Sequence, residues 1–321
     1  MKIDLKNDAR LNFAESTIAQ NHNSDIYYST FEEWLLVTGK RGRGRSARSV
    51  SAHMQDLRVF ASWFERHTQQ GFAPELVTSS DLRAFYQHAA EVERVKPATW
   101  NRRRVSLSLF CEWALSTGRT AYNPFQGVPV MEEVAQSPKW LDKTDYARFM
   151  RRVEQSANTA QTDHARRGAV RDQAMISLMA YAGLRESEVA ELRVADLLLG
   201  DRKGAVTVRN GKGGKTRRIP LGREARRAVG AWLELAGFLE DSWIFYGIST
   251  RQIQRVVRSI GREAGVSVTP HQLRHTMLKR FLDGGGQLTE AAAIAGHSRL
   301  ETTKRYVMPG WEDLERGVEN M

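Results

Sequence analysis

Cysteine is nearly absent from this sequence: Cys111 is the only one among 321 residues. A single cysteine cannot form an internal disulfide, which argues against a disulfide-stabilised scaffold and favours a reducing compartment. Cys111 lies in the apolar sequence Leu109-Phe-Cys-Glu-Trp113, so we expect it to be a buried structural thiol.

Long apolar runs are also missing. None is long enough to cross a membrane, and the first eight residues, Met-Lys-Ile-Asp-Leu-Lys-Asn-Asp, lack the apolar core of a signal peptide. Internal repeats and low-complexity tracts are absent as well. We therefore expect a cytoplasmic protein with no membrane partner.

Positive charge is the main feature of the composition. The chain has 48 Lys and Arg against 37 Asp and Glu, which gives a net charge of +11 and a pI of about 9.9. This balance favours a polyanionic partner, most often nucleic acid, although a basic protein with solvated charge is the alternative. The length and a hydrophobic content of 41% are sufficient for two domains with cores of their own.

The first half of the chain has a helical pattern. The helical signal runs from Tyr27 to about Thr120, and helix starts are predicted at Ser79 and Pro97. A first short helix is indicated by the apolar residues Phe31, Trp34, Leu35 and Val37. A long second helix is predicted by apolar residues at helical spacing, namely Val50, Met54, Leu57, Phe60 and Phe64.

Two prolines and a glycine in Asn123-Pro-Phe-Gln-Gly-Val-Pro129 interrupt this pattern, and a mixed pattern follows from Trp140. Asp172 to Tyr181 is predicted to be helical, and Val206 and Val208 precede a β-hairpin turn. The expected organisation is a flexible leader over 1–25, a helical domain over 26–125, a linker over 126–139, a mixed domain over 140–308, and a tail over 309–321.

Arg185 is predicted to stand where a helix begins. Glu186, Ser187 and Glu188 fill its first turn. A guanidinium there can join the helix N-terminus in holding a phosphate. A surface arginine paired with Glu188 is the alternative.

Lys212 is predicted to lie at the tip of the hairpin, in Asn210-Gly-Lys-Gly-Gly-Lys-Thr216. A phosphate-binding loop is excluded because that motif needs glycine where this chain has Arg209, and because a strand follows instead of a helix. A lysine at such a tip can deliver a proton to a leaving oxygen. The alternative is a solvated turn lysine.

His271 and Arg274 share one face of a helix that Thr269 is predicted to cap. His275 lies four residues after His271, which also suggests a metal site. The zinc-protease motif requires glutamate where this chain has Gln272, which counts against that interpretation.

His297 follows Gly296, which is predicted to end a helix begun at Thr289. The capping box Ser298-Arg-Leu-Glu301 then opens another helix, on which Tyr306 lies. Taken alone, a tyrosine on a short helix usually serves packing.

Arginines gather in three further places. A predicted helix carries four of them on one face, opposite apolar residues, and no acidic residue interrupts this basic stripe. Contact with DNA phosphates or bases is the favoured interpretation, with solvation as the alternative for the other two clusters. The basic stripe consists of Arg251, Arg255, Arg258 and Arg262. The other clusters are Arg41, Arg43, Arg45 and Arg48, and Arg102, Arg103 and Arg104.

The order of these motifs resembles the tyrosine recombinases, the phage-integrase and Xer family, from about residue 26 to the end. The resemblance rests on Gly-Leu-Arg-x-x-Glu, Gly-Lys-Gly-x-Lys, His-x-x-Arg, and a histidine nine residues before a tyrosine. It implies a mainly α fold with a small β-hairpin or sheet. A helical SAM-like core-binding domain and a mixed α+β catalytic domain would form a clamp around DNA.

The resemblance also implies a role for each residue of the set. Tyr306 would attack a DNA phosphate and form a 3′-phosphotyrosine, without metal or cofactor. Lys212 would protonate the leaving oxygen, and Glu188 would support its neighbours. The remaining members would hold the phosphate or assist proton transfer, namely Arg185, His271, Arg274 and His297.

The implied partner is double-stranded DNA, bound by a homotetramer on two recombination sites, with the tail over 309–321 possibly exchanged between subunits. The implied reaction is integration, excision or resolution of a mobile element, plasmid or replicon, and accessory proteins are unspecified. The alternatives are DNA relaxation like that of a type IB topoisomerase, and a non-catalytic DNA-binding regulator derived from a recombinase.

Overall fold

The computed structural model describes residues 26–39, 44–133, 139–211, 215–237, 242–296, 303, 306 and 318–319, with only the backbone at 210, 211 and 215. The chain divides into two compact units, Met1–Ala135 and Gln136–Met321. Each is described separately below.

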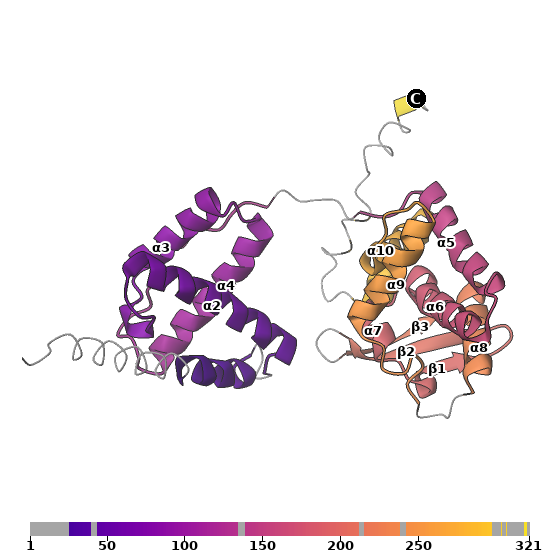
Figure 1. The fold of residues 1–321 in the computed structure, drawn as a ribbon, viewed down its shortest axis with the longest axis horizontal. Coiled ribbons are helices and arrows are strands. Elements are labelled where there is room, and N and C mark those ends of the chain that lie inside the picture. The colour runs from indigo at the N-terminus through magenta and orange to yellow at the C-terminus, as the bar shows by residue number, and fades with distance from the viewer. Residues whose placement is uncertain are drawn as a thin grey trace, which may run out of the picture. The chain divides into compact units, whose positions relative to one another are not determined.

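All regular secondary structure in the described residues of the first unit is helical, as predicted (Figure 1). Residues 26–37 form its first helix, and α2 packs against both α3 and α4. The remaining elements are α2 (Ala47–Thr68), the 3-10 helix η2 (Pro74–Leu76), α3 (Ser79–Gln87), the π-helix η3 (His88–Val92) and α4 (Pro97–Ser116).

Apolar spacing explains how this unit packs. The five apolar residues predicted for α2 are all buried, and Ser46 caps that helix by accepting a hydrogen bond from the Ser49 N–H. The predicted first helix is present, with Phe31 and Leu35 buried and Val37 75% exposed. Val37 lies two residues after Leu35, and this spacing turns its side chain away from the core.

The single cysteine is buried on α4, as predicted. Burial raises the pKa of the Cys111 thiol to about 12, because the apolar surroundings disfavour the charged thiolate. A thiol with this pKa is unreactive at neutral pH.

Part of the segment predicted as a linker packs on the helical unit. The Trp100 indole Nε1 donates a hydrogen bond to the carbonyl of Pro129 at 2.9 Å, and Val128 is buried. The Asn101 side-chain amide donates to the carbonyl of Met131 at 2.9 Å. Residues 128–131 are therefore held against α4, and residues 134–138 lie outside the described part of the chain.

The second unit surrounds a three-stranded antiparallel sheet of order β1-β2-β3 (Figure 1). The predicted hairpin is present, with Val206 paired to Ile219 and Val208 paired to Arg217. The strand β1 was not predicted, because three successive leucines show no alternation. The strands are β1 (Leu197–Leu199), β2 (Gly204–Gly211) and β3 (Lys215–Pro220).

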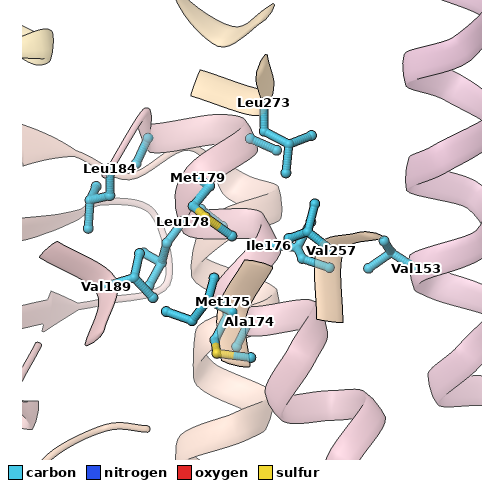
Figure 2. Close-up of a cluster of buried hydrophobic side chains, with 14 of the residues drawn as sticks. Val153, Ala174, Met175, Ile176, Leu178, Met179, Leu184, Val189, Val257 and Leu273 are labelled. Carbon is cyan, nitrogen blue, oxygen red and sulfur yellow. The ribbon is translucent and has the colours of Figure 1, made fainter. Parts of the chain in front are cut away.

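The helical elements of this unit are α5 (Lys143–Asn158), α6 (Asp163–Ala182), α7 (Glu186–Ala190), the 3-10 helix η4 (Val194–Asp196), α8 (Arg223–Ala236), α9 (Thr250–Glu263), α10 (Pro270–Asp283) and α11 (Leu288–Ala295). Of these, α5, α7, α8, α9 and α10 pack against α6. Figure 2 shows the core, in which apolar side chains of α6 lie near Val153, Val257 and Leu273. None of the helices in the described ranges, α6 included, is long and apolar enough to cross a membrane.

Candidate active site

Arg185 immediately precedes α7, as the sequence predicts. The Glu188 carboxylate accepts a hydrogen bond from the Arg185 backbone N–H at 2.9 Å and from its Nη1 at 2.7 Å. The pairing with Glu188 is thus present, and 27% of the Arg185 side chain remains exposed. Within the described part of the chain, Glu188 is the one partner of this guanidinium, so its other donors can serve a ligand.

Arg217 on β3 is a site residue that our sequence analysis missed. Its Nη1 and Nη2 donate to the two oxygens of Glu188 at 2.9 and 2.8 Å, and its Nε donates to the Ile294 carbonyl at 2.9 Å. The side chain is 11% exposed. Arg217 lies two residues before the buried Ile219, so it shares the inward face of the strand, and that position is the sequence signal that would have indicated a buried ion pair.

Glu188 is an ionised carboxylate between two guanidinium groups. Burial raises the pKa of Glu188, but the hydrogen bonds from Arg217 and Arg185 outweigh that effect and leave this pKa below its ordinary value. The carboxylate therefore stays charged at neutral pH and holds both arginines.

Arg274 on α10 is buried, with 2% of its surface exposed. Its two terminal nitrogens donate to the carbonyls of Gly183 and Ala295. Burial lowers the pKa of Arg274 from 12.5 to about 10, and the nearby charge of Arg185 adds to this effect. The group still carries its charge at neutral pH.

Tyr306 is 2% exposed and packs against α10 and α11 through Leu278, Ala291 and Ala295. Its hydroxyl lies within hydrogen-bonding distance of Nδ1 of His275, a residue that our sequence analysis did not place in the site.

His271 is exposed, and its ring lies edge-on to that of His275, with 4.1 Å between centroids. Within the described ranges, no third histidine, cysteine or carboxylate joins these two to form a group of metal ligands.

The structure brings most of the predicted set into one site. Arg185, Arg217, Glu188 and Tyr306 all lie close enough to Arg274 to influence its pKa. Lys212 and His297 lie outside the described residues, as does the capping box at 298–301. Gly296, directly before His297, ends α11 in the left-handed conformation with φ 61°, as predicted.

The basic stripe on α9 is exposed at all four arginines, whereas Ile253, Val257 and Ile260 on the opposite face are buried. The helix therefore presents the charged surface that its sequence predicts. Phosphate contacts are the usual use of such a surface.

Several of the arginines predicted to bind DNA in the first unit form ion pairs or hydrogen bonds within that unit. Arg102 pairs with the buried Asp56, and Arg103 donates to Glu93 at 2.8 Å. Arg104 donates to the Val128 carbonyl at 2.9 Å, and Arg45 donates to the Thr38 carbonyl. Arg48 is exposed. Arg41 and Arg43 lie outside the described residues.

Comparison with known proteins identifies the family. Residues 139–310 match the model of the phage integrase family, and residues 38–118 match the model of its N-terminal SAM-like domain. A tyrosine recombinase XerC of Corynebacterium efficiens is 32% identical over 82% of this chain and 81% of that protein. A tyrosine recombinase XerD of Listeria monocytogenes is 27% identical over 86% of this chain and 91% of that protein.

Solved structures agree in fold. XerH bound to a palindromic difH substrate, in a post-cleavage complex, superposes with a TM-score of 0.67 at 15% identity, covering 84% of this chain and 79% of that one. A lambda integrase fragment bound to a COC′ core site superposes with a TM-score of 0.64 at 17% identity, covering 88% of this chain and 94% of that one. This chain therefore belongs to the phage integrase family of tyrosine-type site-specific recombinases.

Proposed function

We propose that this chain cuts and rejoins double-stranded DNA with Tyr306 as the nucleophile. The observation that carries this proposal is the convergence of Arg185 and Arg274 with Tyr306 around one site. The guanidinium groups of Arg185 and Arg217 both pair with Glu188, and that of Arg274 lies nearby, so these four described residues together carry surplus positive charge. A phosphate gains negative charge when a nucleophile adds to it, and preorganised cations stabilise that charge.

The proposed step balances without a cofactor. The Tyr306 oxygen forms a bond to phosphorus while the bond between phosphorus and the 5′ oxygen breaks. The products are a 3′-phosphotyrosine and a 5′-hydroxyl. Lys212 supplies the proton to the leaving oxygen, and the neighbouring histidines accept the tyrosine proton. Attack by a 5′-hydroxyl of another strand reverses the step and joins that strand.

Arg274 and Arg185 hold the phosphate in this proposal, and His271 assists the acid–base steps. His297 hydrogen-bonds the phosphate or orients the nucleophile. Glu188 keeps Arg185 in place. The basic stripe on α9 and the arginines of the helical unit contact the DNA backbone, so that the two units enclose a duplex. We further propose that the reaction integrates, excises or resolves a mobile element, plasmid or replicon in the cytoplasm.

The first experiment is to capture DNA on the wild-type protein. Fragmented total DNA of the host cell is incubated with the protein, covalent complexes are recovered, and the bound DNA is sequenced to find the site. A nicked duplex with that site then traps the complex, and mass spectrometry maps the adduct.

Tyr306→Phe should abolish the adduct and keep DNA binding, because it removes one hydroxyl and no charge. Tyr122→Phe, which changes an exposed tyrosine of the helical unit, is the matched control. An adduct on another tyrosine, or full cleavage by Tyr306→Phe, would refute the assignment. Strand exchange between two such sites, absent with one site, separates recombination from relaxation.

We also propose that four copies assemble on two sites and that the tail over 309–321 links them, as a heterologous contact that closes into a ring. Deletion of 311–321 should spare binding to one site and prevent synapsis. Gel-shift and two-site recombination assays measure the two effects. Normal tetramer formation and recombination by the shortened protein would refute the role of the tail.

A further inference from the structure

Two arginines from different elements connect the same two segments of the catalytic unit. Arg274 of α10 donates to the carbonyls of Gly183 and Ala295, and Arg217 of β3 bridges Glu188 and the Ile294 carbonyl. One segment carries Arg185, and the other is the C-terminal end of α11. Cationic groups are favourable there because the last carbonyls of a helix carry partial negative charge.

Arg217 and Arg185 use Glu188 in different ways. Arg217 commits all three of its nitrogens to internal acceptors and is 11% exposed. Arg185 shares Oε1 of Glu188 with Arg217 through one terminal nitrogen and is 27% exposed. Arg217 is thus enclosed, while Arg185 keeps donors for a phosphate.

Space around Arg217 is also restricted. A Cβ added to Gly296 would lie 3.1 to 3.2 Å from the Arg217 side chain, which is tighter than an ordinary contact. Gly296 adopts a positive φ of 61°, so this turn both favours glycine and leaves room for the guanidinium. The end of α11 and the Arg217 side chain therefore fit together closely.

We propose that Arg217 is a positioning residue of the active site, which occupies Glu188 so that Arg185 remains available to the DNA phosphate. Without Arg217, the ionised Glu188 would have, among the described residues, Arg185 as its remaining charged hydrogen-bond donor and would draw that guanidinium into a two-pronged pair. The carboxylate would then compete with the phosphate for Arg185. This inference rests on the proposed function and adds a residue outside the predicted catalytic set.

The test compares two substrates that differ in charge at the scissile phosphate. The nicked duplex recovered with the wild-type protein is prepared with the natural phosphodiester or with an uncharged methylphosphonate at the cleavage position. A guanidinium that neutralises phosphate charge matters for the first substrate and much less for the second. Arg185→Ala defines this pattern. Its rate of covalent-complex formation should fall at least ~10²-fold on the phosphodiester and should not fall on the methylphosphonate.

Arg217→Ala should give the same pattern with a smaller loss on the phosphodiester, about 10-fold, as for residues that orient a directly acting group. Arg217→Lys keeps the charge but cannot reach three acceptors with one amine, so its rate should fall between Arg217→Ala and wild type. Addition of Glu188→Gln to Arg217→Ala should raise the phosphodiester rate, because the competing charge is removed.

Arg218→Ala is the matched control, because Arg218 is the next residue of β3 and its side chain is exposed. It removes one positive charge from the same strand and should leave the ratio between the two substrates unchanged. Thermal unfolding of each variant identifies any that fail to fold. Arg217→Lys keeps the test valid if Arg217→Ala is among them.

The inference would be overturned if the rate of Arg217→Ala fell by the same factor on both substrates. A wild-type rate for Arg217→Ala on the phosphodiester would overturn it too. A further fall in rate when Glu188→Gln is added would overturn it as well. Absence of any adduct with the wild-type protein would instead count against the proposed function, so the two failures are distinguishable.

Discussion

The hydroxyl of Tyr306 lies within hydrogen-bonding distance of Nδ1 of His275, the residue that directly follows the buried Arg274. One turn of α10 therefore holds both a phosphate-binding candidate and the partner of the candidate nucleophile. At 2% exposure, Tyr306 is also enclosed by α10 and α11.

His275 should thus matter for cleavage, although the family motif places catalytic function on His271. His275→Leu removes the hydrogen-bond partner of Tyr306 and should slow covalent-complex formation by about 10²-fold, the lower range for loss of an acid–base group. His275→Gln, which keeps a polar partner, should lose less. Single-turnover cleavage of the nicked duplex measures both, with His164→Leu on α6 as an exposed-histidine control. A wild-type rate for His275→Leu would show that the contact between His275 and Tyr306 serves packing and not cleavage.

The basic stripe on α9 leads to a prediction about salt. Charge reversal at Arg255 and Arg258 should weaken DNA binding and flatten its salt dependence, because each lost phosphate contact lowers the log–log slope by about 0.9. Fluorescence anisotropy across a salt series measures the slope. Arg223 and Arg227 on α8 are exposed and provide a control with the same change in net charge. An unchanged slope in the stripe variant would show that α9 faces away from DNA.

Chelation of metal ions should leave cleavage intact. In phosphoryl transfer, a divalent ion can neutralise charge on the phosphate and stabilise the attacking and leaving oxygens. In the proposed site, Arg185, Arg274 and Lys212 perform these roles. Covalent-complex formation in excess EDTA, with DNA binding measured in parallel, checks this expectation. A strict requirement for Mg²⁺ in the cleavage step would contradict the mechanism.

Local features of the fold could be predicted because their causes lie within a few residues. The spacing of apolar residues in α2, the Thr269 cap of α10 and the Gly296 end of α11 all follow from neighbours along the chain. The hairpin formed by β2 and β3 is equally local. In each case the hydrogen bonds or the buried face involve residues of one helix with its caps, or of two consecutive strands.

Contacts that join distant segments could not be predicted in this way. Arg217 and Glu188 are 29 residues apart, and His275 and Tyr306 are 31 apart. Such pairs depend on how β3, α7, α10 and α11 pack, and no local spacing specifies that arrangement. The same reason applies to Arg103, whose pairing with Glu93 depends on the turn between η3 and α4.

A buried polar network in the helical unit connects α2 with α4. Nδ1 of His53 lies 2.8 Å from the Ser106 hydroxyl, which donates to the buried Asp56 at 2.8 Å. Burial lowers the pKa of His53 from 6.5, and the charge of Arg45 lowers it further, whereas Asp56 opposes the shift. Arg102 also pairs with Asp56 and adds to the lowering.

The sign of this shift determines how stability depends on pH. The unfolded chain takes up a proton on His53 near pH 6.5, whereas the folded chain resists it. The stabilisation from neutral His53 is therefore complete above pH 6.5 and is lost as the pH falls through the lowered folded-state pKa.

His53→Asn keeps a hydrogen-bond donor for Ser106 but cannot titrate, so its melting temperature should fall less than that of the wild type between about pH 7.5 and 5.5. Calorimetry of the full chain measures this, with His67→Asn, an exposed histidine of the same helix, as the control. An equal fall in His53→Asn and wild type would show that His53 does not govern the acid sensitivity of the helical unit.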